Sequence, residues 1–235
     1  MNLPSSPGQA IALVVAAGSG RRMGFDKIVA PLAGKPVVCW SLDAFENCPD
    51  ISEGILVCAP GREEEFRRLA VSFPKFRRVV GGGAERTDSV LNGLSAMEGD
   101  PEAIVAVHDG ARPLITPAVI SAVVAAARAG GAAVAAEPAA DTLHRAGDAG
   151  CLVETVSRDN LWAMQTPQAA GRHLLQHALE AARKSGQHVT DEISALLATG
   201  VRATPVPHGT LNFKVTWPRD LELAESVLRR RLDRQ

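Results

Sequence analysis

The sequence predicts an α/β fold, in which a mostly parallel sheet is flanked by helices. Short apolar runs alternate with longer segments whose apolar residues recur at helical spacing, and this alternation is typical of consecutive strand-helix units. Two of the runs, residues 11–16 and 103–107, are apolar throughout, as strands buried on both faces are. The length of 235 residues suits a single domain over residues 11–235, preceded by a flexible tail over residues 1–10.

The first predicted strand runs into a loop rich in glycine and basic residues, AAGSGRRMGFDK over residues 16–27. Gly18, Gly20 and Gly24 let backbone N–H groups turn toward an anion, and three basic side chains supply positive charge. The spacing GxGxxxG differs from the dinucleotide fingerprint, and Phe25 stands where a Walker loop needs lysine. We therefore predict a polyphosphate site. A tight turn with solvated arginines remains the alternative for this stretch alone.

The composition argues against several classes of protein. The formal net charge is −1, so neither a nucleic-acid partner nor a membrane surface is indicated. Four cysteines without CxxC spacing indicate reduced structural thiols and not a zinc site or a disulfide framework. The first ten residues contain no lysine or arginine and no long apolar run, so we expect no signal peptide and a cytoplasmic protein.

Strands and helices alternate after the first loop. The pattern predicts helices over residues 37–47 and 62–72 and strands over residues 54–59 and 76–80. A second glycine turn, residues 81–83, then precedes another helix. Ligands of open α/β sheets bind beyond the carboxyl ends of the strands, so the two turns are expected to hold two ends of one nucleotide. A helix start that contains glycines is the alternative for the second turn.

The apolar run 103–107 predicts a strand that ends next to His108 and Asp109, and it places both residues at the same carboxyl edge of the predicted sheet. A carboxylate beside a phosphate site would repel the ligand unless it caps the next turn or binds a cation. Mg²⁺ takes one or two carboxylates together with phosphate oxygens, so we favour Asp109 as a ligand of Mg²⁺ or another divalent cation. His108 has no partner at metal-ligand spacing and is predicted to be structural.

The alternating pattern breaks at residues 138–160, which are polar and rich in turn residues. Short alternating runs around a glycine-containing turn predict a strand-turn-strand arm that projects from the sheet. Exposed segments of this length usually carry function or an oligomer contact.

The rest of the chain predicts further elements: helices over residues 117–129, 172–184, 191–198 and 218–232, and strands over residues 132–136, 201–206 and 212–216. Thr190 is the expected N-cap of the third of these helices. Lys214 falls inside the last strand, where a lysine indicates either a functional role or a sheet edge.

Seven motifs occur in order along the chain: AAGSGRRMG with Lys27, GGGAERTDSV, VHDGARP, DTLHR, TVSRDNLWAMQTPQ, VTDEISAL and NFKVTWPRDL. Together they resemble the 2-C-methyl-D-erythritol 4-phosphate cytidylyltransferases of the non-mevalonate isoprenoid pathway. The likeness extends from residue 11 to the final helix. It implies a Rossmann-like nucleotidyltransferase fold, a homodimer formed through the arm, and transfer of a cytidylyl group from CTP to methylerythritol phosphate with release of pyrophosphate.

The resemblance also implies three sets of site residues. The triphosphate would be held by Ala16, Ala17, Gly18, Ser19, Gly20, Arg22 and Lys27. Cytidine would be held by Gly83, Ser89 and the backbone of Gly110. Methylerythritol phosphate would be surrounded by Asp109, Arg112, Thr142, Arg158, Thr166, Thr190 and Lys214, with Asp109 also serving the metal. Several of these contacts would cross the dimer.

The acceptor phosphate is already a nucleophile at neutral pH, so catalysis requires positioning and charge neutralisation more than a general base. We expect Arg22 and Lys27 to stabilise charge on the α-phosphate and the departing pyrophosphate. Arg158 and Lys214 are expected to orient the acceptor.

The chain departs from the family pattern at three positions. Val15 stands where family members often carry proline, and Ala84 and Ser157 each stand where they often carry an acidic residue. Ala84 removes one side-chain contact expected near the nucleoside. Two alternatives stay open: a ribitol 5-phosphate cytidylyltransferase and a catalytically silent nucleotide-binding module. The arm motif argues against the first, and the joint presence of the metal carboxylate and the acceptor-side cations argues against the second.

Overall fold

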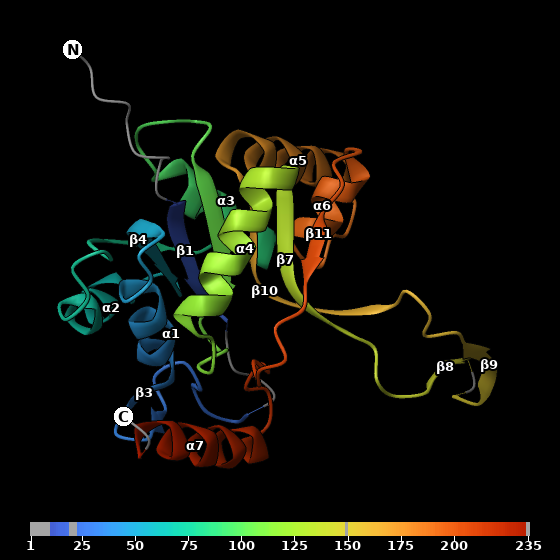
Figure 1. Cartoon of the computed structure of the whole chain (residues 1–235). Helices are drawn as coiled ribbons and strands as arrows, with labels where there is room; N and C mark the ends of the chain where they lie inside the picture. Colours follow the sequence, from blue (N-terminus) through green and yellow to red (C-terminus); the bar gives the residue numbers. More distant parts are fainter. Residues whose placement is uncertain (1–9, 19–22, 149, 234–235) are drawn as a thin grey trace.

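A computed structural model describes residues 10–18, 23–148 and 150–233 (Figure 1). Its centre is a seven-stranded sheet in the order β11-β7-β10-β6-β1-β4-β5. The strands are β1 (Ala10–Ala16), β4 (Ile51–Cys58), β5 (Arg78–Gly81), β6 (Ile104–Asp109), β7 (Ala132–Pro138), β10 (Trp162–Gly171) and β11 (Thr204–Val206). Strand β10 runs antiparallel to both of its neighbours, and the other pairs are parallel. The predicted mostly parallel sheet is confirmed.

Helices cover both faces of this sheet. On one face lie α1 (Val37–Glu46), α2 (Glu63–Ala70) and α4 (Pro117–Gly130), and on the other lie α3 (Arg86–Ser95), α5 (Arg172–Ser185) and α6 (Glu192–Ala198). Alternate side chains of a strand point to opposite faces, so Val14 packs with the first set and Leu13 with the second. This double burial explains why the sequence of β1 is apolar throughout.

A third apolar cluster lies under the C-terminal helix. Helix α7 (Pro218–Leu232) packs against the short hairpin of β2 (Pro31–Leu32) and β3 (Lys35–Pro36). Ala224 and Leu228 of this helix are buried in one cluster with Leu32 and Met23. The helix therefore covers the segment that follows the first glycine loop. Within the described residues, no helix combines the length and the apolarity that a bilayer span requires.

The predicted arm is present and extends away from the sheet (Figure 1). The chain leaves the sheet at the end of β7, forms the antiparallel hairpin β8 (Leu143–Ala146) and β9 (Leu152–Val156), and returns through β10. Leu152 and Val153 of the hairpin are 69% and 63% exposed. Such exposure of adjacent apolar side chains sets this hairpin apart from the buried strands of the sheet.

Two predictions about the later elements are wrong, and one strand was not predicted. Residues 212–216 do not form a strand, and the Val215 N–H donates to the Ala111 carbonyl oxygen in the loop after β6 at 2.8 Å. Thr190 does not cap α6. Asp191 does, since its Oδ1 accepts a hydrogen bond from the Ser194 N–H at 2.8 Å. Strand β10 was not predicted, because its first half mixes apolar and polar residues without regular alternation and its burial begins only at Thr166.

Candidate active site

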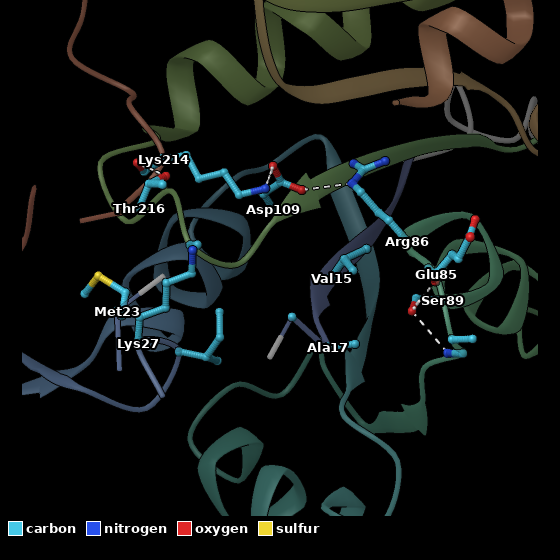
Figure 2. A pocket seen from close by; sticks show the side chains of 15 residues that line it. Val15, Ala17, Met23, Lys27, Glu85, Arg86, Ser89, Asp109, Lys214 and Thr216 are labelled. Carbon is cyan, nitrogen blue, oxygen red and sulfur yellow. Dashed lines mark hydrogen bonds and ion pairs between the residues drawn. The ribbon is translucent and has the colours of Figure 1, made fainter. Parts of the chain in front are cut away.

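A cavity of about 650 Å³ opens at the carboxyl edge of the sheet, where β1, β5 and β6 end (Figure 2). Parallel strands bring the loops that follow them to one edge, so segments distant in the sequence meet there. The polar side chains that line the cavity include Lys27, Glu85, Arg86, Ser89, Asp109, Lys214 and Thr216. The site is therefore rich in cations around one buried carboxylate.

Asp109 is that carboxylate. It ends β6 and is 8% exposed. Its Oδ2 accepts a hydrogen bond from Lys214 Nζ at 2.9 Å, and its Oδ1 accepts one from Arg86 Nε at 3.2 Å, from opposite sides (Figure 2). Arg112 Nε lies 3.7 Å from Oδ2. Burial would raise the pKa of Asp109, but the charges of the three cations hold this pKa well below its usual range. The carboxylate stays ionised at neutral pH.

A chain of hydrogen bonds beneath the cavity holds the backbone of Asp109. The Asp109 N–H donates to Thr166 Oγ1 at 3.1 Å, and this hydroxyl lies 2.9 Å from His108 Nδ1. His108 Nε2 lies 3.3 Å from the Arg112 carbonyl oxygen, so Nε2 carries the ring proton and Nδ1 accepts from Thr166. Burial lowers the pKa of His108 to about 3, so its ring is neutral. His108 thus supports the site without facing it.

Arg86 joins three elements of the site. Its guanidinium donates to both carboxylate oxygens of Glu192, at 2.6 and 3.0 Å, and Glu192 is completely buried. Burial would lower the pKa of Arg86, but Glu192 and Asp109 raise this pKa above its usual range. A bidentate pair fixes the plane of the guanidinium. Arg86 therefore holds α3, α6 and the end of β6 in one arrangement.

Two lysines enter the cavity from segments far apart in the sequence. Lys27 is 8% exposed, and its Nζ donates to the Val215 carbonyl oxygen at 2.8 Å. The neighbouring residue, Lys214, donates to Asp109. Adjacent residues of the 212–216 segment thus hold both Lys27 and Asp109.

The second glycine turn closes the cavity beside β1. The Gly83 N–H donates to Ser89 Oγ at 3.1 Å, and the Ser89 hydroxyl donates to the Glu85 carbonyl oxygen at 3.0 Å. A Cβ at Gly82 would lie 2.7 Å from the Cβ of Ala17, and one at Gly83 would lie 2.2 Å from the Cβ of Asp88. A larger residue at position 82 would push the turn away from the first loop, and one at position 83 would push it away from α3, so close packing requires glycine at both positions.

The family model for 2-C-methyl-D-erythritol 4-phosphate cytidylyltransferase (IspD) matches residues 10–230. The chain belongs to this family. It is 43% identical over 228 residues to the enzyme of that name from Pelotomaculum thermopropionicum, with 95% of both chains covered. It is 42% identical over 241 residues to the one from Ralstonia nicotianae, with 97% of this chain and 95% of the relative covered. The crystal structure of 4-diphosphocytidyl-2C-methyl-D-erythritol synthase from Anaerococcus prevotii aligns with a TM-score of 0.82 at 28% identity, covering 94% of this chain and 97% of that one.

Seven of the residues predicted from the likeness to this cytidylyltransferase family line the cavity: Ala17, Gly18, Lys27, Gly83, Ser89, Asp109 and Lys214. Four others lie next to these residues: Ala16, Gly110, Arg112 and Thr166. The hydroxyl of Thr166 is buried and bonds to Asp109 and His108, and Arg112 Nη1 donates to the Asn212 carbonyl oxygen at 2.8 Å. Ser19, Gly20 and Arg22 lie outside the described residues.

The remaining three predicted residues do not line the described cavity. Thr142 and Arg158 are exposed residues of the arm, and Arg158 Nη1 donates to the Ala140 carbonyl oxygen. Thr190 is exposed before α6, with its hydroxyl 3.4 Å from that of Ser194. The described part of the chain therefore gathers most of the predicted residues at the cavity, on the nucleotide side and the acceptor side, whereas Thr142, Arg158 and Thr190 lie apart from it.

Sequence reasoning missed Arg86 and Glu192. Arg86 begins the helix after the second glycine turn, and a cation at that place could have been assigned to the same sheet edge as Asp109. Glu192 gives no such signal, because an acidic residue in the first turn of a helix is ordinary. Only the fold shows that it is buried against a cation 106 residues away.

Proposed function

We propose that this chain transfers the cytidylyl group of CTP to 2-C-methyl-D-erythritol 4-phosphate and releases pyrophosphate. One observation carries the proposal: Lys27, Asp109 and Lys214 share one cavity at the carboxyl edge of the sheet in a member of the cytidylyltransferase family. A cavity of about 650 Å³ is large enough for a nucleotide with a small phosphorylated acceptor beside it.

The reaction replaces one phosphoanhydride bond. A phosphate oxygen of the acceptor attacks the α-phosphorus of CTP, a new P–O bond forms, and the bond to the bridging oxygen of the β-phosphate breaks. The acceptor phosphate is ionised at neutral pH, so the enzyme needs to position it and neutralise charge more than to remove a proton. The buried neutral ring of His108 agrees with a reaction that needs no general base, because this ring supports Asp109 and has no proton-transfer role.

The cations of the cavity divide between the two substrates in this proposal. Lys27, beside the first glycine loop, stabilises the triphosphate and the pyrophosphate that leaves. Lys214 and Arg112, which flank Asp109, attract and orient the acceptor phosphate. Arg22 retains its predicted role at the triphosphate, although it lies outside the described residues.

Asp109 fits a divalent cation that is shared with the phosphates. Each of its carboxylate oxygens accepts one hydrogen bond within 3.2 Å, so lone pairs remain for a metal. In the described parts of the chain, no group of three or more His, Cys, Asp and Glu residues could hold a metal by itself. Mg²⁺ requires only one or two carboxylates when phosphate oxygens complete its shell. We propose Asp109 as its protein ligand, and the bound ion would neutralise phosphate charge.

The arm supports a proposal about assembly. Arg158 and Thr142 are exposed and do not line the cavity of the described chain, and the hairpin that joins them presents Leu152 and Val153 to solvent. We propose a homodimer in which the arm of one subunit completes the acceptor site of the other. Pairing would bury the apolar hairpin and bring Arg158 to a phosphate.

Subunit complementation tests this assembly. Lys27→Ala and Arg158→Ala subunits are each expected to be impaired when alone. A hybrid dimer contains one site with an intact Lys27 and an arm from the partner with an intact Arg158, so mixing after dissociation should restore activity. If each arm instead served its own subunit, no hybrid site would be intact and mixing would restore nothing.

Pyrophosphate release in the presence of Mg²⁺ tests the reaction itself. CTP, UTP and GTP are each offered with 2-C-methyl-D-erythritol 4-phosphate or with ribitol 5-phosphate. We expect release with CTP and the methylerythritol substrate. Release with ribitol 5-phosphate in preference would assign the chain to the other acceptor, and silence with every pair would favour a nucleotide-binding module.

A further inference from the structure

The segment that carries Lys214 is held from outside the cavity by the first turn of α7. Asp220 Oδ2 accepts hydrogen bonds from the Thr216 N–H at 2.7 Å and from the Trp217 N–H at 2.8 Å. These N–H groups belong to the N-cap residue and the residue before it, where no helical carbonyl is available to them. Charge-assisted hydrogen bonds from backbone N–H groups to a carboxylate are among the stronger means of fixing such a turn. Asp220 is not one of the residues that line the described cavity.

Two cavity lysines depend on this segment. Lys214 Nζ donates to Asp109, and the carbonyl oxygen of Val215 accepts from Lys27. The Val215 N–H donates to the Ala111 carbonyl oxygen at 2.8 Å. Residues 212–216 are irregular, so no strand ladder sets their position. Individual hydrogen bonds and the attachment to α7 determine it instead.

Helix α7 is itself fixed at its far end. Leu228 is 3% exposed and packs in the cluster that contains Leu114. Arg231 Nη1 donates to the carbonyl oxygen of Leu114 at 2.8 Å. Since Leu114 follows Arg112 by two residues, the helix and the loop after β6 are held together. The first turn of α7 therefore presents Asp220 from a rigid support.

We propose that Asp220 is a positioning residue for the transfer reaction. By holding the N–H groups of residues 216 and 217, it sets the place of Lys214 Nζ and of the carbonyl oxygen that holds Lys27. The inference rests on the proposed function, because it gives these two lysines a role in the reaction. A displacement of about 1 Å at a reacting centre can lower a rate by about a hundredfold. Loss of Asp220 is therefore expected to lower kcat without disturbing the second glycine turn.

Three variants test this role through the kinetics of pyrophosphate release. Asp220→Ala should lower kcat about tenfold or more and leave the calorimetric affinity for CTP within about threefold. Asp220→Asn keeps an oxygen that accepts both hydrogen bonds and should recover most of kcat. Glu222→Ala, the control, removes the same charge from an exposed place on α7 and should resemble the wild type. Rates are compared well below each variant's Tm, so that only folded protein is measured.

A double-mutant cycle asks whether Asp220 acts through Lys214. If it does, Asp220→Ala should reduce kcat far less in a Lys214→Ala background than in the wild type. Full additivity, an Asp220→Asn variant as slow as Asp220→Ala, or an Asp220→Ala variant within twofold of Glu222→Ala would each overturn the proposal. If the wild type releases no pyrophosphate, the proposed function fails and the inference fails with it.

Discussion

The cavity and the arm are built in opposite ways. Around the cavity, Asp109 and Glu192 are 8% and 0% exposed, and each is tied to charged partners of the same chain. In the arm, Leu152 and Val153 are 69% and 63% exposed on a two-stranded hairpin that stands apart from the sheet. Buried polar groups need satisfied partners, and isolated hairpins need something to pack against. The contrast separates what one chain builds by itself from what, in our proposal, a second chain completes.

This contrast bears on the two substrates as well. The residues predicted for the triphosphate and the nucleoside that the structure describes lie in or beside the cavity at the carboxyl edge of the sheet. Two of the residues predicted for the acceptor lie in the arm. Substitutions of cavity residues should therefore change chemistry or stability, whereas substitution of a predicted acceptor residue in the arm should change acceptor use with little effect on CTP.

The largest expected effect is that of Lys27→Ala. Removing a cation that stabilises transition-state charge should lower kcat by about a thousandfold. Steady-state assays of pyrophosphate release at saturating substrate concentrations measure this change in kcat. Lys184→Ala, which removes an exposed lysine of α5, should behave as the wild type. Turnover of the Lys27→Ala variant within a few fold of the wild type would show that this cation does not stabilise the reaction.

Glu192→Gln should reduce the free energy of unfolding by about 3 kcal/mol, because it leaves a largely buried guanidinium with one charged partner fewer. Urea unfolding with an unchanged m-value measures this loss. The matched control is Glu98→Gln, whose carboxylate is 87% exposed opposite Arg78 and should matter by less than about 0.5 kcal/mol. Equal small losses in the two variants would show that the pair with Arg86 does not stabilise the cavity.

His108 should make the fold sensitive to acid. Its pKa is about 3 in the folded protein and about 6.5 when unfolded, so the unfolded chain binds more protons between these values. Stability is full above pH 6.5 and falls as the pH decreases, by about 2 kcal/mol between pH 7 and pH 5. The depressed pKa of Asp109 adds its own loss only below about pH 4.

Urea unfolding at several pH values checks this dependence. His108→Gln should lose most of the slope between pH 7 and pH 5, whatever its stability at pH 7. His188→Gln, which replaces an exposed histidine, should keep the wild-type slope. An unchanged slope in the His108→Gln variant would mean that the ring is not held neutral by burial.

Arg158→Ala should have the smallest effect and the most selective one. The KM for methylerythritol phosphate should rise about tenfold, as expected for one charge-assisted contact, with CTP affinity and Tm unchanged. Arg145→Ala, in the hairpin of the same arm and paired with Glu154, is the control and should leave KM unaltered. A drop in CTP affinity in the Arg158→Ala variant would remove the distinction between cavity and arm.

Part of the fold was predictable because its signals are local. The buried strands β1 and β6 and the helices between them follow from runs and spacings within about fifteen residues. The arm was predictable from the interruption of that pattern. Strand β10 was not, because a strand that is half exposed and half buried has no uniform pattern. The pattern of residues 212–216 predicts a strand that the structure lacks, because a local pattern does not specify whether a neighbouring strand is available for pairing.

The sequence by itself determined the chemical groups of the site: two glycine turns, the carboxylate of Asp109, and cations in an order typical of one enzyme family. Only the tertiary structure decided which of these groups meet. Lys214 reaches Asp109 across 105 residues, and Lys27 reaches Val215 across 188. Glu192 became part of the site in the same way. The physical reason is that a parallel sheet collects its strand ends at one edge, so contacts between distant segments depend on strand order, which no local pattern specifies.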